Sequence, residues 1–427
     1  MIQIYPYSKE TAASVFSRMA AQTDVSQTVS AILADVRENG DAALRRYSEK
    51  FDGVRIIDPE VTPAEFEEAM TRVEPEFLRV LESAADNIRA FHSKQKRDGF
   101  RLTKENGVIV GQRVLPIAKV GLYVPGGTAA YPSTVLMDGI PAKIAGCGQI
   151  VMVTPPGKDG KIPANILAAA RIAGIDRVFK MGGAQAIAAL AYGTQSVPKV
   201  DKIVGPGNAY VAEAKKQVFG TVSIDMIAGP SEILVVADGT GDPRHIAADL
   251  LSQAEHDRMA SAVLVTDSMA LAQAVQAEIE KQLLSLSRQE IARASIDTNG
   301  KIIVAETLDA GIEIANDLAP EHLELCVDDP FTYLEKVKNA GSVFLGKYCP
   351  EALGDYYAGP NHTLPTGGTA RFSSPLSVDD FVKKSQFLYY PRDAFTQIAA
   401  DVDLFARKEG LTAHGRSAMI RLEEDAL

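Results

Sequence analysis

The 427-residue chain has little of what marks several large classes of protein. Its three cysteines, Cys147, Cys326 and Cys349, are too few and too scattered for a disulfide framework or a CxxC zinc site. No stretch approaches the ~20 uninterrupted apolar residues that a membrane helix needs. Charged residues such as Lys9 and Arg18 interrupt the start of the chain, so no signal peptide is predicted and we expect a cytoplasmic protein.

Basic residues are scarce as well. The chain has 44 Lys and Arg against 55 Asp and Glu, which gives a formal net charge of −11. A nucleic-acid-binding protein needs a basic surface to neutralise phosphates, so this balance argues against a nucleic-acid partner and favours a small-molecule substrate. With 46% hydrophobic and 23% charged residues, the composition is that of a globular protein. The length predicts roughly three folded units.

The first hundred residues follow a helical pattern. Apolar residues recur at helical spacing over 26–37, and Gly40 follows as a stop signal. Thr62-Pro63, a capping residue followed by a first-turn proline, begins a helix that is predicted to run to about residue 73. A third helix is predicted over about 75–96.

From Gly107 onward, short β-rich runs alternate with helical patterns. Two examples are QIVMVT at 149–154 and AVLVT at 262–266. This alternation predicts an α/β fold, in which mainly parallel sheets are covered on both faces. The two runs and the helices before them are faintly alike, which reflects either an old duplication or the same demands of two parallel sheets. The tail from Ser377 onward is predicted to be helical.

A complete dinucleotide fingerprint and a P-loop are both missing. The nearest match is Gly205-Pro206-Gly207-Asn208, in which Tyr210 stands where the third glycine is required. Glycine-rich turns are nevertheless predicted at several strand ends, where open α/β sheets bind ligands, although glycines also serve simply as tight turns. These turns are Pro125-Gly126-Gly127, Gly182-Gly183, Gly205-Pro206-Gly207 and Gly229-Pro230-Ser231.

The chain has only six histidines, and four of them have polar neighbours. His256 follows Gln253 by three residues, the spacing at which two side chains share a helix face. His322 follows Glu321 directly, which places a base beside an acid. The other two are His362, seven residues after Asp355, and His414, five residues after Glu409. The two histidines without such neighbours are interpreted as structural or surface residues: His92 and His245.

Zinc sites are built from histidine, carboxylate and thiolate ligands, so these histidines and Asp355 are candidate ligands, with Gln253 as an unusual fourth. No HExxH motif occurs, which argues against a metalloprotease of that type. Spacing along the sequence leaves open whether the four histidines share one site.

Eight segments, in order along the chain, resemble those of the histidinol dehydrogenase family, and the resemblance as a whole runs from about residue 25 to the end. They are VGLYVPGGTAAYPSTVLM, KMGGAQAIAALAYGT, IVGPGNAYVAEAKK, IDMIAGPSEILVVAD, DLLSQAEHD, APEHLEL, ALGDYYAGPNHTLPTGGTARFSSPL and LTAHGRS. The resemblance implies two incomplete Rossmann-like α/β domains with helical N-terminal and C-terminal arms. The implied boundaries are an N-terminal arm at 1–22, a first domain at 23–123 and 232–376, a second domain on the NAD side at 124–231, and a dimerisation arm at 377–427.

The resemblance also implies the reaction, which is the oxidation of L-histidinol to L-histidine through histidinal, the last steps of histidine biosynthesis. The family uses two NAD⁺ and one Zn²⁺ per subunit, and it forms homodimers whose sites are shared between subunits. Glu321 and His322 match the catalytic pair, and His414 and Glu409 match residues that reach over from the second subunit. The matching zinc ligands are Gln253, His256, Asp355 and His414. The matching substrate contacts are Ser231, Gln253, His256, His322, Asp355, His362, Glu409 and His414. The matching NAD contacts are Tyr123, Gln185 and Asn208.

The chemistry of these residue types suits the implied reaction. Hydride can leave the alcohol carbon only as the hydroxyl proton departs, and an imidazole with an unperturbed pKa of ~6.5 suits that task, which favours His322 as the base. The second oxidation needs a hydrated aldehyde, so Glu321 is expected to activate water. A covalent route through an activated cysteine would need Cys326, four residues past His322, whereas the apolar residues around Cys326 favour a core position.

Three other functions remain open at the level of sequence. A related zinc- and NAD-dependent enzyme could oxidise another small polyol, such as a sulfopropanediol, although Ser231, His362 and Glu409 argue against that. A zinc hydrolase would use Glu321 and no nicotinamide. A catalytically silent dimer would use zinc only for stability.

Overall fold

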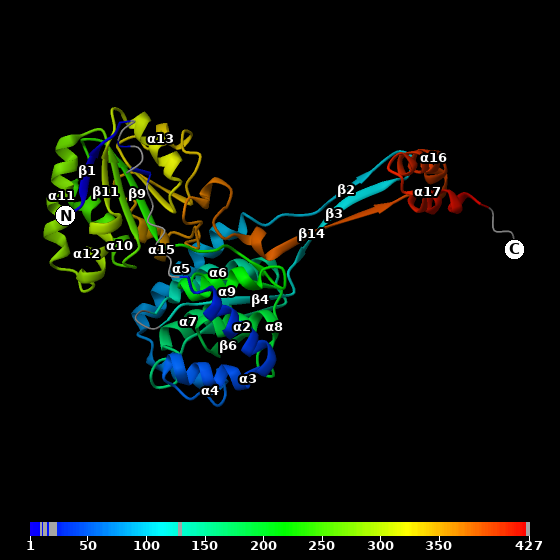
Figure 1. Cartoon of the computed structure of the whole chain (residues 1–427), viewed down its shortest axis with the longest axis horizontal. Helices are drawn as coiled ribbons and strands as arrows, with labels where there is room; N and C mark the ends of the chain where they lie inside the picture. The colour runs from blue at the N-terminus through cyan, green and yellow to red at the C-terminus, as the bar shows by residue number, and fades with distance from the viewer. Residues whose placement is uncertain (9–10, 12–14, 17–23, 127–129, 424–427) are drawn as a thin grey trace. The chain divides into compact units, whose positions relative to one another are not determined.

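The computed structural model describes residues 1–8, 11, 15–16, 24–126 and 130–423, and it divides into two compact units. The larger unit comprises residues 1–96 and 117–381, and the smaller one comprises 97–116 and 382–427. Figure 1 traces their helices and strands. In the described ranges, no helix is long and apolar enough to cross a membrane.

The first sheet of the larger unit has six parallel strands in the order β1-β11-β10-β9-β12-β13. Side chains alternate along β9, so Ile233 and Val235 pack on one face while Leu234 and Val236 pack on the other. Helices α10, α11 and α12 cover the first face, and α13 covers the second (Figure 1). The strands are β1 (Gln3–Pro6), β9 (Glu232–Ala237), β10 (Ser261–Thr266), β11 (Lys301–Val304), β12 (His322–Cys326) and β13 (Ser342–Leu345). The helices are α10 (Pro243–Ala254), α11 (Met269–Leu283), α12 (Gln289–Asn299), α13 (Leu308–Leu318), α14 (Phe331–Leu334) and α15 (Glu351–Tyr356).

The second sheet has five parallel strands in the order β6-β5-β4-β7-β8. Along the chain, β5 and β6 are added on one side of β4, and β7 and β8 are then added on its other side. The strand order therefore reverses between β4 and β7, which is the topological switch point. The strands are β4 (Lys119–Tyr123), β5 (Gln149–Thr154), β6 (Arg177–Lys180), β7 (Lys202–Val204) and β8 (Ser223–Ile224). The helices are α6 (Pro132–Ala145), α7 (Ala164–Ala173), α8 (Gly183–Tyr192) and α9 (Ala209–Val218).

The predicted early helices form and pack against this second sheet. Helices α4 and α5 share a core with α6 and α7, whereas α2 and α3 share one with α8 and α9. Thr62 and Glu65 form a capping box at the start of α4, as the Thr62-Pro63 signal predicts. The bounds are α2 (Ser26–Asn39), α3 (Asp41–Tyr47), the π-helical η1 (Ser48–Asp52), α4 (Pro63–Arg72) and α5 (Pro75–Ser93). The predicted α/β class is confirmed, while the predicted domain boundaries stay a prediction.

The smaller unit corrects one sequence prediction. The tail after Ser377 is not helical throughout, because β14 pairs antiparallel with β3, which also pairs with β2. Its partner β3 lies about 270 residues earlier in the chain, so the residues around β14 carry no local sequence signal for this pairing. The strands are β2 (Phe100–Thr103), β3 (Ile109–Pro116) and β14 (Val382–Tyr389), followed by α16 (Arg392–Lys408), α17 (Thr412–Met419) and η4 (Ile420–Leu422). Two short 3₁₀ helices, η2 (Thr369–Arg371) and η3 (Val378–Phe381), belong to the larger unit.

Helix α6 joins the second sheet to the segment that follows α15. Its Asp138 is fully buried and accepts a hydrogen bond from Thr363 Oγ1 at 2.8 Å, and the Met137 carbonyl accepts one from Asn361 Nδ2 at 2.6 Å. Burial, together with the nearby Asp225 carboxylate, raises the pKa of Asp138 to about 8 against the opposing effects of Thr363 and Lys215. Folding therefore favours the protonated carboxyl group of Asp138.

This shift predicts a pH-dependent effect of Asp138→Asn on stability. A carboxyl group whose folded pKa is raised keeps a proton that the unfolded chain releases, so it lowers stability progressively as pH rises from about 4 towards about 8. Asparagine cannot ionise and keeps the acceptor for Thr363. The melting temperature of Asp138→Asn relative to the wild type is thus expected to be higher at pH 8 than at pH 5. Asp98→Asn, at an exposed position, is the control for the loss of one charge. If the melting temperature of Asp138→Asn differed from that of the wild type by the same amount at both pH values, the buried, protonated state of Asp138 would be contradicted.

Candidate active site

His322 lies at the start of β12, beside the start of β9, and its side chain is buried. Its Nδ1 lies 3.0 Å from the carbonyl oxygen of Glu232, which can only accept a hydrogen bond, so Nδ1 carries a proton. Its Nε2 lies 3.5 Å from Asp355 Oδ1. In the neutral ring, Nε2 is therefore the nitrogen that can take up a proton.

Glu321 lies next to His322 in the sequence and in space. Its Oε2 accepts a hydrogen bond from the backbone N–H of Glu232 at 2.8 Å and lies 3.6 Å from Nδ1 of His322. Burial raises the pKa of Glu321 to about 7 against the lowering effect of His322. A carboxyl group with such a pKa can both take up and release a proton near neutral pH.

Gln253 and His256 lie at the end of α10, where the sequence predicts them together. The helix ends at Ala254, so His256 lies in the following turn and not on the helix face, and its N–H donates to the Gln253 carbonyl at 3.1 Å. The Gln253 side chain is buried, with Nε2 3.3 Å from Nδ1 of His322. Burial lowers the pKa of His256, against an opposing effect of the Asp355 carboxylate.

Asp355 lies on α15 together with Glu351, which the sequence analysis does not predict as a site residue. Glu351 is buried, accepts from Ser252 Oγ at 2.6 Å, and therefore connects α15 to the helix that carries Gln253. Ligand atoms of His322, Glu351 and Asp355 lie within 4.8 Å of one another. The signal in the sequence is the spacing of Glu351 and Asp355 by four residues, which places the two carboxylates on one face of a helix.

The site suits a cation. Among the described side chains, Gln253 Oε1 and His322 Nε2 are buried without a hydrogen-bond partner. Burial lowers the pKa of His322, but the carboxylates of Glu321 and Asp355 outweigh it and raise that pKa to about 10. Negative charge therefore dominates around His322, and a cation beside Asp355 would offset it. The amide, imidazole and carboxylate groups gathered there fit a borderline metal such as zinc.

His362 also reaches this site. Its Nδ1 lies 3.0 Å from the Asp355 carbonyl oxygen, and its Nε2 lies 3.2 Å from Thr134 Oγ1 at the start of α6. Ser231 directly precedes β9, whose first residue contacts both Glu321 and His322. The Gly229-Pro230-Ser231 turn thus leads into a strand, and Gly229 donates a hydrogen bond to Thr366 Oγ1 at 2.6 Å.

The three predicted NAD contacts lie at carboxyl ends of strands in the second sheet or in the helices that follow. Tyr123 ends β4, and its hydroxyl oxygen accepts from the Gly183 N–H at 3.1 Å. Gln185 lies in the first turn of α8, with Oε1 buried and unpartnered among the described groups. Asn208 caps α9, with Oδ1 accepting from Tyr210 and Val211. Gly127, which is predicted to lie in a glycine-rich turn, is outside the described residues.

Two of the remaining predicted residues belong to the smaller unit. His414 on α17 and Glu409 at the end of α16 are exposed residues of the smaller unit. His92 is fully buried, with Nδ1 2.7 Å from Gln95 Oε1, and His245 is about half exposed near Asp242. These last two positions agree with their interpretation as structural and surface residues.

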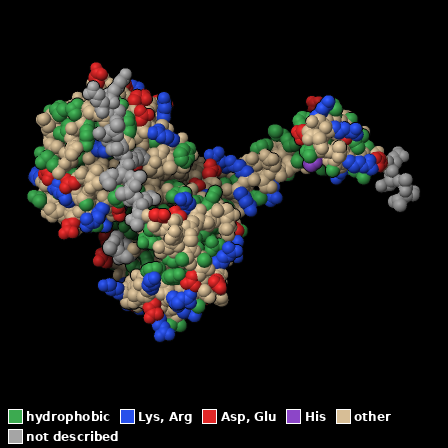
Figure 2. Space-filling view, viewed as in Figure 1, with side chains coloured by type: hydrophobic (Ala, Val, Ile, Leu, Met, Phe, Trp, Pro, Cys, Tyr) green, Lys and Arg blue, Asp and Glu red, His purple; other side chains and the backbone are tan. Residues whose placement is uncertain are grey.

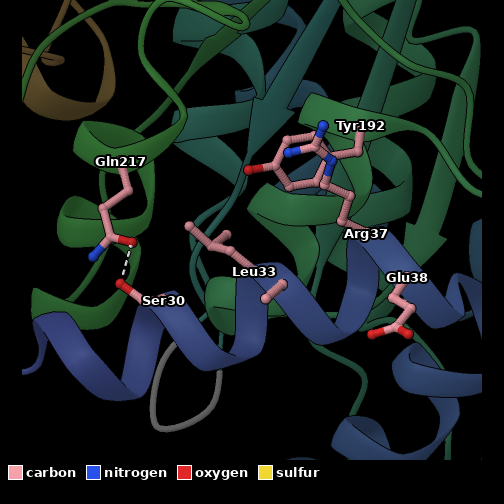
Figure 3. A pocket seen from close by; sticks show the side chains of 7 residues that line it. Ser30, Leu33, Arg37, Glu38, Tyr192 and Gln217 are labelled. Atoms are coloured by element: carbon pink, nitrogen blue, oxygen red, sulfur yellow. Dashed lines mark hydrogen bonds between the residues drawn. The ribbon is translucent and has the colours of Figure 1, made fainter.

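A surface cavity of about 500 Å³ lies apart from these residues, between α2, α8 and α9 (Figure 3). Its charged side chains, Arg37 and Glu38, are exposed, and its polar pair Ser30–Gln217 is already hydrogen-bonded at 2.8 Å. On the face drawn in Figure 2, acidic and basic side chains are interspersed, without a continuous basic stripe. The perturbed groups around His322 are therefore the stronger candidate for an active site.

Comparison with known proteins assigns the family. The family model described as histidinol dehydrogenase matches residues 17–422. The chain belongs to the histidinol dehydrogenase family. It is 55% identical over 400 residues to the histidinol dehydrogenase of Clostridium acetobutylicum, covering 94% of this chain and 93% of that one. It is 56% identical over 395 residues to the Bacillus subtilis enzyme, covering 92% of each.

A crystal structure of histidinol dehydrogenase from Elizabethkingia anophelis has the same fold. The two structures superpose with a TM-score of 0.93 at 39% sequence identity, and the match covers 99% of this chain and 98% of the E. anophelis chain. The family resemblance seen in the sequence is thus confirmed, and the chain is an oxidoreductase of the histidinol dehydrogenase type.

The position of Cys326 at the end of β12 argues against a covalent route. Its side chain is buried, and burial together with the charges of Glu324 and Asp249 raises the pKa of its thiol to about 12. The thiolate is the nucleophilic form, so this cysteine is expected to be unreactive near neutral pH.

Replacement of Cys326 by alanine tests this expectation. The turnover number of Cys326→Ala is predicted to stay within about twofold of the wild type, because no step needs its thiol. Steady-state NADH formation measures the effect, and the partly exposed Cys349→Ala is the matched control. A loss of turnover of a hundredfold or so in Cys326→Ala, with an unchanged melting temperature, would instead indicate a covalent intermediate.

Proposed function

We propose that this enzyme oxidises L-histidinol to L-histidine through histidinal with two NAD⁺, as the last steps of histidine biosynthesis. The observation that carries the proposal is the buried Glu321–His322 pair, held against Gln253 and Asp355 in a chain of this family. A biosynthetic role of this kind fits a cytoplasmic protein.

We assign the metal site to Gln253, His256 and Asp355 of one subunit together with His414 of a second subunit. The unpartnered Gln253 Oε1 and the surplus of carboxylate charge support a zinc ion there. When bound, zinc supplies a positive charge and an acceptor for the amine and imidazole nitrogens of the substrate, which positions the substrate. His362 and Ser231 of the same subunit, and Glu409 of the second subunit, are assigned as further substrate contacts.

His322 in its neutral form is the proposed base of the first oxidation, and the positive charge of a bound metal would favour that form by offsetting the carboxylates that raise its pKa. The Glu232 carbonyl holds Nδ1 and fixes the ring, so Nε2 takes the hydroxyl proton of histidinol. The carbon–hydrogen bond breaks at the same time, and its electron pair leaves with hydrogen as hydride to NAD⁺. The products are histidinal, NADH and one proton on His322.

Glu321 is proposed to act before the second oxidation. Water adds to the aldehyde carbon as the Glu321 carboxylate takes one of its protons, and the proton that His322 gained in the first step passes to the aldehyde oxygen, which gives the hydrate. Loss of hydride from the hydrate to a second NAD⁺, with removal of a hydroxyl proton, then gives the carboxylic acid. A pKa near 7 lets Glu321 serve as the acceptor and afterwards release the proton.

NAD is proposed to bind beside the second sheet, at Tyr123, Gln185 and Asn208. The switch point between β4 and β7 supports this choice, since open α/β sheets bind ligands where the strand order reverses. The buried, unpartnered Oε1 of Gln185 offers an acceptor for a polar group of the cofactor.

His322→Asn tests the assignment of the base. Asparagine keeps a polar side chain of similar size but cannot accept the proton, so NADH formation from histidinol is predicted to fall about 10²–10⁴-fold. His245→Asn, at a partly exposed position outside the site, is the matched control and is expected to keep full activity. Turnover of a folded His322→Asn protein near the wild-type rate would show that another group is the base.

Mixing two inactive variants tests the shared site. In a heterodimer of His322→Ala and His414→Ala, one site has both changes and the other has neither. Random pairing therefore predicts recovery of about a quarter of wild-type activity, since half the dimers each contain one intact site. Heterodimers isolated with two different tags that recover nothing would place His414 in the site of its own chain or outside the site.

A further inference from the structure

A buried ion pair contacts the turn that follows β7, and neither of its residues has a role in the proposed reaction. Lys215 on α9 pairs with Asp225 after β8, and their side chains are only 2% and 1% exposed. Removing two charges from water is costly unless further hydrogen bonds compensate. The other contacts of the pair therefore indicate what it does.

Both members of the pair are hydrogen-bonded to the backbone of Gly205. The Lys215 Nζ donates to the Gly205 carbonyl oxygen at 2.9 Å, and the Gly205 N–H donates to Asp225 Oδ2 at 2.8 Å. Both polar groups of the Gly205 backbone are thus held by the ion pair. Asp225 is itself fixed, because its Oδ1 accepts from the Met226 N–H at 2.6 Å.

Gly205 begins the turn that leads to Asn208 and α9. Its φ is +115°, and a Cβ at this position would lie 2.1 Å from the carbonyl oxygen of Tyr123. The turn is therefore pressed against the end of β4, in a conformation that L side chains rarely adopt. At its other end, Asn208 Oδ1 accepts from the N–H groups of Tyr210 and Val211 at 3.1 and 3.2 Å.

Asp138 extends the same cluster towards the substrate side. Its Oδ2 lies 3.2 Å from a Cβ position built on Gly205 and has no hydrogen-bond partner among the described residues. Its Oδ1 accepts from Thr363, the residue after His362. The Gly205 turn thus packs beside Asp138, which is hydrogen-bonded to the segment that brings His362 to the active site.

We propose that Lys215 and Asp225 are positioning residues for NAD, which hold the turn from Gly205 to Asn208 against the end of β4 in the shape that accepts the dinucleotide. This inference rests on the proposed binding of NAD at Tyr123 and Asn208. It predicts that loss of the pair weakens the binding of NAD⁺ more than the binding of histidinol, because most of the proposed histidinol contacts lie on or beside β9, α10, β12 and α15, and neither Lys215 nor Asp225 is hydrogen-bonded to His362.

The test compares Lys215→Met with Lys202→Met in the full-length protein. Lys202 lies at the opposite end of β7 from Gly205, and it too is a buried lysine in an ion pair, with Asp380 at 3.2 Å. Lys215→Met is expected to raise the KM for NAD⁺ at least about tenfold while the KM for histidinol stays within about twofold. Lys202→Met is expected to lower the melting temperature without changing the KM for NAD⁺.

A double variant keeps the proposal testable if Lys215→Met does not fold. Lys215→Met/Asp225→Asn removes both charges, keeps an acceptor for the Gly205 N–H, and loses the bond to the Gly205 carbonyl. It is expected to show the same rise in KM for NAD⁺. An unchanged KM for NAD⁺ in either folded variant, or an equal rise in Lys202→Met, would overturn the positioning role. A wild-type protein that reduces no NAD⁺ with histidinol would instead refute the proposed function itself.

Discussion

The hydrogen bond from His322 Nδ1 to the Glu232 carbonyl is the contact on which the rest of the site depends. It joins the first residues of β12 and β9, two neighbouring strands of one parallel sheet, so the ring is fixed by the sheet itself. Its position also brings Nε2 towards Asp355 on α15 and Nδ1 towards Gln253 at the end of α10. Three elements thus converge on one imidazole. Rigid strands and helices hold reacting groups more accurately than loops do.

This arrangement departs from the usual geometry of open α/β sheets in one respect. Ligands normally bind beyond the carboxyl ends of the strands, and the second sheet presents Tyr123 and the Gly205 turn at such ends. Glu321 and His322, however, lie at the amino end of β12. The hydrogen bonds of Thr134 and Asp138 to His362 and Thr363 connect the two sheets within the larger unit. In the proposed reaction, that connection would bring cofactor and substrate together.

Local pattern was enough to predict most of the parallel sheet elements. QIVMVT forms β5 over the predicted residues, AVLVT lies within β10, and α4 begins at the predicted Pro63, because buried strands and capped helices carry their signal within the segment. The strand β12 was missed, since its His322 and Glu324 interrupt the apolar pattern although both are buried. Strands β1 and β14 depend on partners about 300 and 270 residues away. The candidate site shows the same division, because Glu321–His322 is visible in the sequence, whereas Glu351 and the pair Lys215–Asp225 acquire meaning only through the fold.

The stoichiometry of NAD⁺ reduction tests the central claim most directly. The purified protein is given limiting L-histidinol and excess NAD⁺, before chelation, after chelation and after addition of Zn²⁺, and NADH and L-histidine are both quantified. Two NADH per histidinol, with activity that is lost on chelation and returns with zinc, is the predicted result. No histidinol-dependent NADH, or full activity in protein that contains no metal, would contradict the account.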